Sequence, residues 1–136
     1  MKLVSQSLTG LPWFLLYFVL ALALLVAFVA IYGRMTPYDE RTLIREGNVA
    51  AAISLAGAIL GFTLPLASAI AHSVGIVDML LWGLVALVVQ IAVYFAVSRA
   101  MPHFAEAIRT GKTASATLLA VLAVAVGLLN AACMTY

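Results

Sequence analysis

Four long apolar stretches constrain the fold of this chain more than any other feature. They cover residues of about 11–32, 49–71, 78–98 and 113–133, and about 20 apolar residues are enough to cross the hydrocarbon core of a bilayer. Hydrophobic residues make up 66% of the 136 residues and charged residues only 9%, whereas about a quarter of the residues in a soluble domain are charged. The sequence therefore predicts an all-α membrane protein, with four transmembrane helices in a single integral membrane domain over residues 1–136.

The first apolar stretch follows Lys2, an arrangement that also occurs in secretory signal peptides. The small-residue pattern Ala-Leu-Ala at 21–23 lies in the middle of this stretch, which continues to Tyr32. A signal-peptide cleavage region follows the apolar core and does not interrupt it. We therefore expect a retained first transmembrane helix, with Trp13 and Tyr32 near opposite membrane interfaces.

The distribution of Lys and Arg predicts the orientation of the chain. The loops after the first and third apolar stretches carry three basic residues each, and the opposite side carries only Lys2. Loops rich in Lys and Arg remain in the cytoplasm. We therefore expect a multi-pass protein of the bacterial cytoplasmic (inner) membrane with both termini extracytoplasmic and two cytoplasmic basic loops: Arg34, Arg41 and Arg45, then Arg99, Arg109 and Lys112.

Each basic loop is expected to contain a short interfacial helix. Thr36 and the proline after it have the form of a helix N-cap and a first helical residue, which predicts a helix over about 37–46. Pro102 is expected to begin the second short helix. Asn48 and Asp78 are predicted to cap the second and third transmembrane helices.

The two halves of the chain resemble each other, over about 11–71 and 78–133. Each half has a transmembrane stretch, a proline-led basic loop and a second transmembrane stretch. This order predicts two parallel two-helix repeats. The matching positions lie 65 residues apart at Pro37 and Pro102, and 64 apart at Arg45 and Arg109 and at Gly47 and Gly111.

Small residues recur at four-residue spacing in the second and fourth apolar stretches. In lipid, where packing rather than water exclusion holds helices together, this spacing lets two helix backbones approach closely. We therefore predict helix–helix packing through these residues and a homo-oligomer surrounded by membrane lipids. The candidate packing residues are Ala50, Ser54, Gly57, Ala58, Gly61, Ala123, Gly127 and Ala131.

Four polar residues within the apolar stretches are candidates for a polar core or pore: Ser54, Thr63, Gln90 and Asn130. A polar side chain is costly against lipid, so each should face other helices. One interpretation is a polar core or pore, and the other is hydrogen bonding between helices. For Gln90, near the middle of its stretch, hydrogen bonding between helices is favoured.

The two basic loops provide candidate contacts for anionic lipid headgroups or for an acidic cytoplasmic partner. These candidates are Arg41, Arg45, Arg109 and Lys112. The alternative is that these charges only set the topology of the chain, and this alternative is favoured.

The sequence contains few groups that could support catalysis. His72, Asp78 and Cys133 are all predicted near the extracytoplasmic surface, where they could form a thiol–imidazole–carboxylate group or a weak metal site. No spacing motif supports such a group, so helix-end and packing roles are favoured. We expect no enzyme, no cofactor and no metal site, and the absence of a basic stripe predicts no nucleic-acid partner.

Three segments together resemble the YjfL-like proteins, a family of small bacterial inner-membrane proteins with a domain of unknown function. They are TPYDERTLIREGNVAAA at 36–52, GAILGFTLPLASA at 57–69 and NAACMTY at 130–136. The resemblance implies four transmembrane helices in the inner membrane. It also implies a gene-neighbourhood association with phage-shock-type membrane-stress proteins, including PspA-like proteins, and with an ATP-grasp amide ligase. It implies no catalytic residues.

From these observations we expect an oligomeric scaffold or sensor in bacterial envelope or membrane-stress maintenance, with a PspA-like protein as a candidate cytoplasmic partner. The alternative is an oligomeric ion or small-solute channel. Because a single four-helix bundle of this size encloses little space, such a pore would have to form between subunits.

Overall fold

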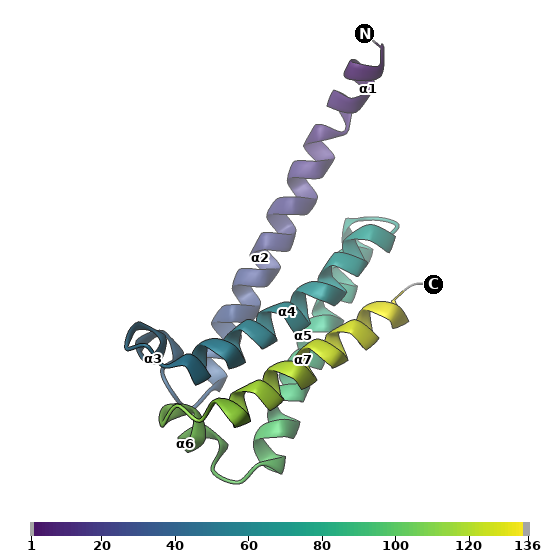
Figure 1. Cartoon of the computed structure of the whole chain (residues 1–136). Helices are drawn as coiled ribbons and strands as arrows, with labels where there is room; N and C mark the ends of the chain where they lie inside the picture. The colour runs from purple at the N-terminus through teal and green to yellow at the C-terminus, as the bar shows by residue number, and fades with distance from the viewer. Residues whose placement is uncertain (1, 135–136) are drawn as a thin grey trace.

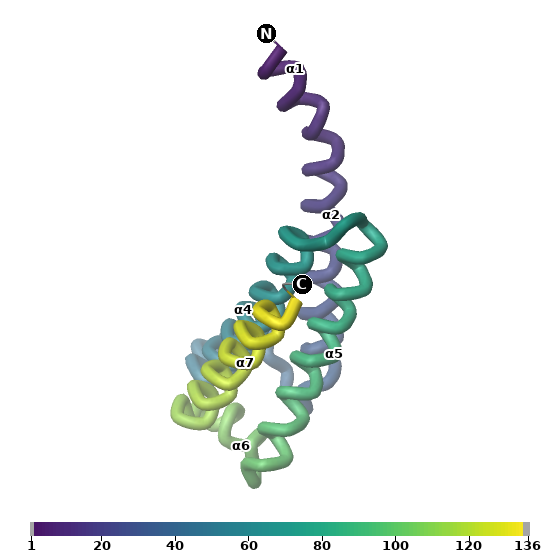
Figure 2. Tube along the Cα trace, turned by 90° about the vertical axis from the view of Figure 1, so that its right-hand side faces the viewer, coloured from purple at the N-terminus to yellow at the C-terminus, as the bar shows by residue number. Residues whose placement is uncertain are grey.

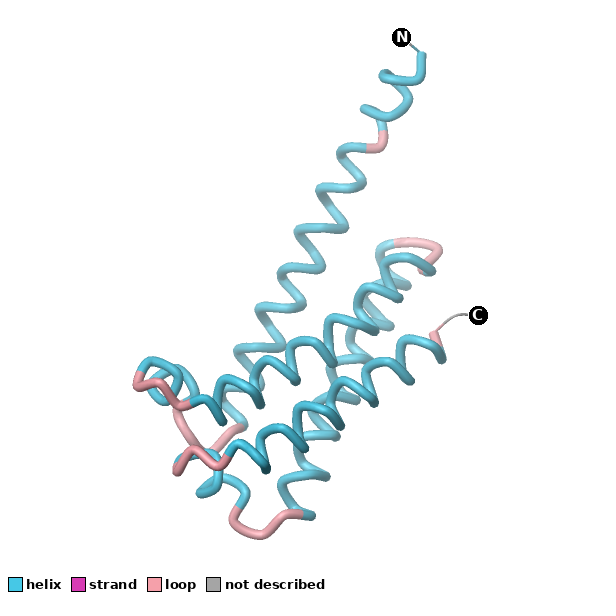
Figure 3. The backbone as a smooth tube through the Cα atoms, viewed as in Figure 1, coloured by secondary structure: helices cyan, strands magenta, loops and turns pink. Residues whose placement is uncertain are grey.

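The computed structural model describes residues 2–134 and is helical throughout, with no strand among these residues (Figures 1 and 3). Four helical segments are long and apolar enough to cross a membrane, which confirms the all-α prediction and the predicted number of spans. The helices are α1 (Lys2–Thr9), α2 (Leu11–Met35), α3 (Glu40–Arg45), α4 (Val49–His72), α5 (Ile76–Ala100), α6 (Phe104–Arg109) and α7 (Thr113–Cys133).

The first spanning segment is longer than the sequence predicted. Lys2–Thr9, which precede the predicted first stretch, form helix α1, and α1 continues into α2 with only a turn at Gly10. Pro12 lies in the first turn of α2, where the missing N–H of proline costs nothing because that group has no helical partner.

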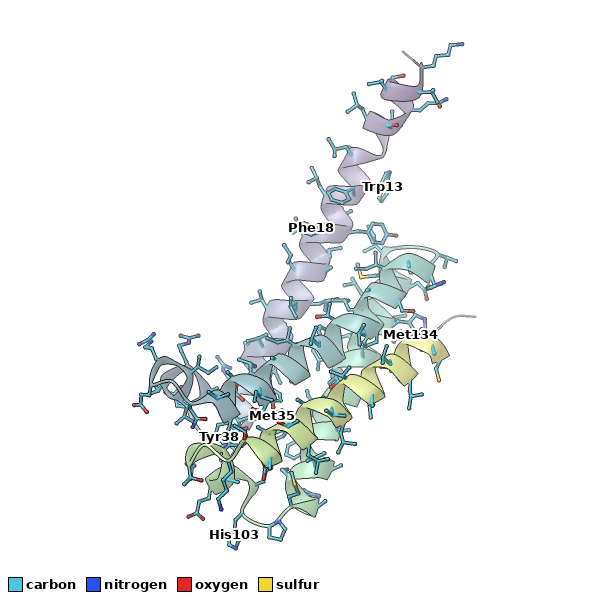
Figure 4. The ribbon with its side chains drawn as sticks, viewed as in Figure 1. Trp13, Phe18, Met35, Tyr38, His103 and Met134 are labelled. Atoms are coloured by element: carbon cyan, nitrogen blue, oxygen red, sulfur yellow. The ribbon has the colours of Figure 1, made fainter. Side chains whose placement is uncertain are left out.

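Helix α4 is the central helix of the bundle. It lies beside α7 along most of its length, and α5 packs against both of them (Figures 1 and 2). The most apolar part of α4 is 50% buried, whereas the corresponding part of the first segment is only 6% buried. Helix α2 joins the bundle near its C-terminal end and leans away from it toward its N-terminus, where Trp13 and Phe18 are exposed (Figure 4).

The connection between α2 and α4 differs from the predicted one. Thr36 does not begin the short helix but ends α2, because its N–H donates to the carbonyl of Tyr32. The short helix α3 begins at Glu40, three residues later than predicted, and Asp39 is its N-cap. The carboxylate of Asp39 accepts hydrogen bonds from the hydroxyl of Thr42 at 2.6 Å and from its N–H at 3.4 Å.

Two other predicted helix starts were also wrong. Helix α6 begins at Phe104 and not at Pro102, and its N-cap His103 has a left-handed backbone conformation with φ of 60°. Helix α5 begins at Ile76, so Asp78 lies in its first turn and is not its N-cap. The Asp78 carboxylate instead accepts a hydrogen bond from the N–H of Val74 at 3.1 Å, which secures the turn before the helix.

Helices α3 and α6 end in the same way. Gly47 and Gly111 follow them with φ of 86° and 80°, a conformation that glycine adopts without strain. The next N–H in each case bonds back across the helix end, from Asn48 to the carbonyl of Leu43 and from Lys112 to that of Ala107. We call the segments from α3 to Asn48 and from α6 to Lys112 the two elbows.

Aromatic side chains connect four helices in the core. Phe62 of α4 stacks on Phe28 of α2 with ring centroids 4.7 Å apart, and Tyr32 one turn later packs edge-on against Tyr94 of α5 at 5.3 Å. Tyr94 in turn contacts Phe104 of α6 at 6.1 Å. This row of rings fixes the C-terminal half of α2 against the bundle, because such contacts favour offset or edge-to-face geometry.

Candidate functional site

Six of the seven Lys and Arg residues lie at the end of the molecule that carries the two elbows (Figures 1 and 3). We call it the basic end. It is the strongest candidate for a functional surface, because the membrane-spanning parts of the helices are apolar and Lys2 is the one basic residue, Lys or Arg, at the opposite end.

The side chain of Asn48 links the two elbows. Its Oδ1 accepts a hydrogen bond from the N–H of Ala51 at 3.0 Å, which caps α4 as the sequence predicted. Its Nδ2 donates to the carbonyl of Ile108 at 2.8 Å and to that of Arg109 at 3.3 Å. These carbonyls lie at the C-terminal end of α6, where backbone acceptors have no partner within the helix. One side chain thus satisfies two helix ends.

A second link runs in the opposite direction. The guanidinium of Arg109 donates a hydrogen bond to the carbonyl of Pro37, in the connection before α3. Arg109 is therefore partly structural, whereas Arg41, Arg45 and Lys112 are exposed on the two elbows. Together, Asn48 and Arg109 join the two elbows into one surface that carries these exposed cations.

Several polar groups are buried at the first elbow and next to it. Glu40 is only 7% exposed, and Tyr32 and Tyr38 are 1% and 4% exposed. The hydroxyls of both tyrosines and Oε1 of Glu40 have no hydrogen-bond partner of normal geometry among the described residues. Ser54 and Tyr94 lie close enough to affect the ionisation of Tyr38. Figure 4 shows Tyr38 at the junction of the two elbows. We call these five residues the Glu40 cluster.

Burial determines the charge state of this cluster. It raises the pKa of Glu40 to about 8, because a carboxylate is disfavoured where water cannot reach it. Burial also raises the pKa of Tyr38, and the nearby Tyr94 and Glu40 add to this effect. Asp39 behaves in the opposite way, since its hydrogen bonds from Thr42 lower its pKa. Adjacent carboxyls therefore differ at neutral pH, with Asp39 ionised and Glu40 largely protonated.

The closest helix contact in the bundle is a seam of small residues between α4 and α7. A Cβ added at Gly61 would lie 2.5 Å from the carbonyl oxygen of Ala123, and one added at Gly127 would lie 2.2 Å from that of Gly61. Ala50, Ser54, Gly57, Ala58 and Ala123 are also buried, and Ala131 is half-buried.

Gln90 of α5 closes this seam from the third side. Its Nε2 donates to the carbonyl of Gly61 at 3.0 Å and to that of Ala123 at 3.1 Å, so one amide bridges three helices. Gln90 is 2% exposed. This is the geometry of hydrogen bonding between helices and not of a pore-lining group.

The other polar candidates are not gathered into a path through the subunit. The hydroxyls of Ser54 and Thr63 donate to carbonyls of their own helix, at Ala51 and Ile59. Asn130 is half-buried on α7, and its Nδ2 has no partner among the described residues.

The residues considered for catalysis lie at helix ends. Nδ1 of His72 lies 3.0 Å from the carbonyl of Ser68 in the same helix, and Cys133 is exposed at the end of α7. Residues 2–134 contain no group of three or more His, Cys, Asp or Glu side chains placed to hold a metal ion.

Comparison with known proteins places this architecture in a family. Residues 6–134 match the family model described as Domain of Unknown Function (DUF350). The chain belongs to the DUF350 family. Two proteins named UPF0719 inner membrane protein YjfL, from Escherichia coli K12 and from E. coli O157:H7, are each 39% identical to it over 120 residues. The aligned region covers 88% of this DUF350 protein and 91% of each relative. The resemblance to YjfL-like proteins is thus confirmed. No solved structure matches the chain.

Sequence reasoning missed the buried state of Glu40 in this DUF350 protein. A six-residue helix is too short for its periodicity to show which face is buried, and Tyr94, one of the groups near Glu40, comes from a distant part of the chain. One feature of the sequence could have indicated this burial. Three tyrosines lie near the ends of apolar stretches on the same side of the membrane as Glu40: Tyr32, Tyr38 and Tyr94. The last two residues of the 130–136 segment, Thr135 and Tyr136, lie outside the described residues.

Proposed function

We propose that this DUF350 protein is a non-enzymatic scaffold or sensor of the bacterial inner membrane that acts in envelope or membrane-stress maintenance. The observation that carries the proposal is the link between the elbows. Asn48 joins residues 60 positions apart in the chain, so the exposed cations of both halves form one surface of fixed shape. A fixed charged surface on a tightly packed bundle is suited to recruitment, because little flexibility is lost when a partner binds.

Two arguments support the location and orientation of this surface. The YjfL relatives carry the inner membrane in their name. Loops rich in Lys and Arg stay in the cytoplasm, and six of the seven cations lie at the basic end. We therefore place the basic end in the cytoplasm and both termini outside, with α3 and α6 at the membrane interface.

We also infer that the chain consists of two parallel repeats. Each half contains a long helix, a six-residue helix, a glycine with positive φ and a second long helix. The hydrogen bond from Asn48 to Leu43 corresponds to that from Lys112 to Ala107 at an offset of 64 in both donor and acceptor. Asn48 itself has no counterpart, because position 112 is a lysine. This difference lets one elbow bind the other.

The partner expected for this surface is an acidic cytoplasmic protein, and a PspA-like membrane-stress protein is the first candidate. The test uses the full chain in zwitterionic nanodiscs and a purified PspA-like protein. Reversing the charge at two exposed positions, in the double variant Arg41→Glu/Lys112→Glu, should weaken binding at least about tenfold. The new glutamates would repel the acidic partner.

Lys2→Glu is the matched control for the single variant Lys112→Glu, because each reverses one cation and the two lie at opposite ends of the molecule. Lys2→Glu should leave binding unchanged. Absence of binding by the wild type would reject this partner. An equal loss with Lys2→Glu would show that the attraction depends only on net charge and not on the basic end.

A channel between subunits is the second candidate, and Asn130 is the observation that favours it. Its buried amide nitrogen lacks a partner within the described part of the subunit, and such a group in a membrane is costly unless another chain or water satisfies it. Ion or solute flux from reconstituted vesicles that is lost in Asn130→Leu would establish this function. Absence of flux in the wild type across a range of cations, anions and small solutes would eliminate it.

A further inference from the structure

An open groove of about 990 Å³ lies between α2, α3 and the N-terminal half of α4. One part of it is apolar and is lined by Leu25, Val29 and Leu55. The other part is at the basic end, where Arg34, Arg41 and Arg45 line it. The groove lies where the C-terminal half of α2 meets the first elbow and α4, at the end of the molecule that carries α3 (Figure 1).

The dimensions of the groove match one leaflet of a bilayer. Leu25 and Arg34 lie on the same helix and both line the groove. At a rise of about 1.5 Å per residue, they are separated by about 13 Å along the axis of α2. Half of a hydrocarbon core is about 15 Å thick. The groove therefore runs from the depth of the acyl chains to the level of the headgroups.

The charges around the groove favour an anion. Three guanidiniums line it, against the carboxyls of Asp39 and Glu40. Asp39 is ionised at neutral pH and contributes one negative charge. Burial raises the pKa of Glu40 to about 8, so Glu40 adds little negative charge and the three guanidiniums remain in excess. Helix α4 contributes only apolar Leu55. The excess of guanidinium groups suits a phosphate, which arginine binds through paired hydrogen bonds.

We propose that this groove binds one anionic phospholipid from the leaflet at the basic end, with its phosphate on the three arginines and an acyl chain against α2. The site is specific to the first half of the chain, because α6 and α5 present a single arginine pair at their own pocket, Arg99 and Arg109. The proposal goes beyond the scaffold function and does not depend on a cytoplasmic partner.

An apolar helix from a second copy of the chain fits the groove less well. Such a helix would cover the three arginines without offering them an acceptor, and burying an unpaired charge is costly. A phospholipid satisfies both parts at once, because its phosphate accepts from the guanidiniums while its chain covers Leu25 and Val29.

The test measures phosphatidylglycerol and phosphatidylcholine binding to the full-length protein by native mass spectrometry in mild detergent. Wild type should bind phosphatidylglycerol at least about tenfold more tightly than phosphatidylcholine. The variant Arg34→Gln/Arg41→Gln/Arg45→Gln should lose this preference. Arg99→Gln/Lys112→Gln removes two other cations of the same end and should retain it. Equal binding of both lipids by wild type, or an equal loss in the control, would overturn the proposal.

A second variant tests the apolar part of the groove without changing its charge. Ala30 lines the groove on the exposed side of α2, so Ala30→Phe should block the acyl chain and weaken phosphatidylglycerol binding at least about fivefold. Inorganic phosphate is the competing probe. Displacement of the lipid by phosphate at similar concentrations would show a site for soluble phosphate instead. Full binding of phosphatidylglycerol by Ala30→Phe would show that the acyl chain does not lie in the groove, and would also overturn the proposal. Dimers that dissociate on Ala30→Phe would show that a second copy fills the groove.

Discussion

Gly127→Ala should separate the two most tightly packed helices of the bundle. The new methyl carbon would lie 2.2 Å from the carbonyl oxygen of Gly61. Both groups are on helix backbones, so a rotamer change cannot relieve the overlap. Ordinary contact begins near 3.4 Å, and α4 and α7 must therefore move apart by about 1.2 Å at this point.

This movement also affects Gln90. Its Nε2 bonds to Gly61 of α4 at 3.0 Å and to Ala123 of α7 at 3.1 Å. Separating α4 from α7 by about 1.2 Å moves these two acceptors apart, so one of the two bonds should lengthen beyond hydrogen-bond range. A hydrogen bond between membrane helices contributes about 0.6 kcal/mol on average, and overpacking costs about 1–3 kcal/mol. The higher helix propensity of alanine offsets up to about 1 kcal/mol. We expect a net loss of about 1–3 kcal/mol in the free energy of unfolding.

The measurement is unfolding in mixed micelles with increasing SDS, followed by tryptophan fluorescence and circular dichroism. Gly33→Ala is the matched control, because Gly33 is also helical but a Cβ there meets nothing within 4 Å. It should be neutral or slightly stabilising. If Gly127→Ala unfolds at the same or a higher SDS fraction than wild type, close backbone packing does not stabilise the bundle and the argument fails.

Three further predictions concern the basic end. The pKa of Glu40 is about 8 in the folded protein, against 4.5 for an unperturbed glutamate. The free energy of unfolding should therefore fall as pH rises between these values. Glu40→Gln should remove this fall and be more stable by roughly 2–4 kcal/mol at pH 8.5 in SDS titrations; parallel pH profiles would contradict this. Asn48→Asp keeps the cap of α4 but loses the donor to Ile108, so it should cost about 1 kcal/mol. Asn48→Ala should cost about 2 kcal/mol, because it loses both the cap and the donor. Equal costs for the two variants would show that the hydrogen bond from Asn48 to Ile108 contributes nothing to stability. His103→Gly should raise stability by about 1 kcal/mol in the same assay, because it relieves a left-handed backbone; a loss would refute it.

The spans could be predicted from the sequence because lipid imposes one simple requirement, a run of apolar residues of sufficient length. The start of α4 could also be predicted, since Asn48 directly precedes the apolar run. The start of α3 could not. Thr36 and Asp39 are both good caps, and only the end of α2, which uses Thr36, decides between them.

The candidate site was less predictable than the fold. The exposed cations could be read from the sequence, because charge is a property of single residues. The burial of Glu40 and the reach of Asn48 to Ile108 depend on how distant segments meet. A sequence pattern within one helix carries no information about such contacts. The groove likewise depends on how the C-terminal half of α2 meets α3 and α4.

The pairing of α4 with α7 has a consequence for biogenesis. The helix with the most buried face is the second to enter the membrane, and its main partner is the last. During synthesis, the glycine face of α4 must remain in lipid until α7 has been translated. A chain truncated before Thr113 would keep that face uncovered, with the amide of Gln90 deprived of one acceptor. Such a chain should be a ready substrate for membrane proteases, so that degradation would distinguish unfinished chains from complete ones.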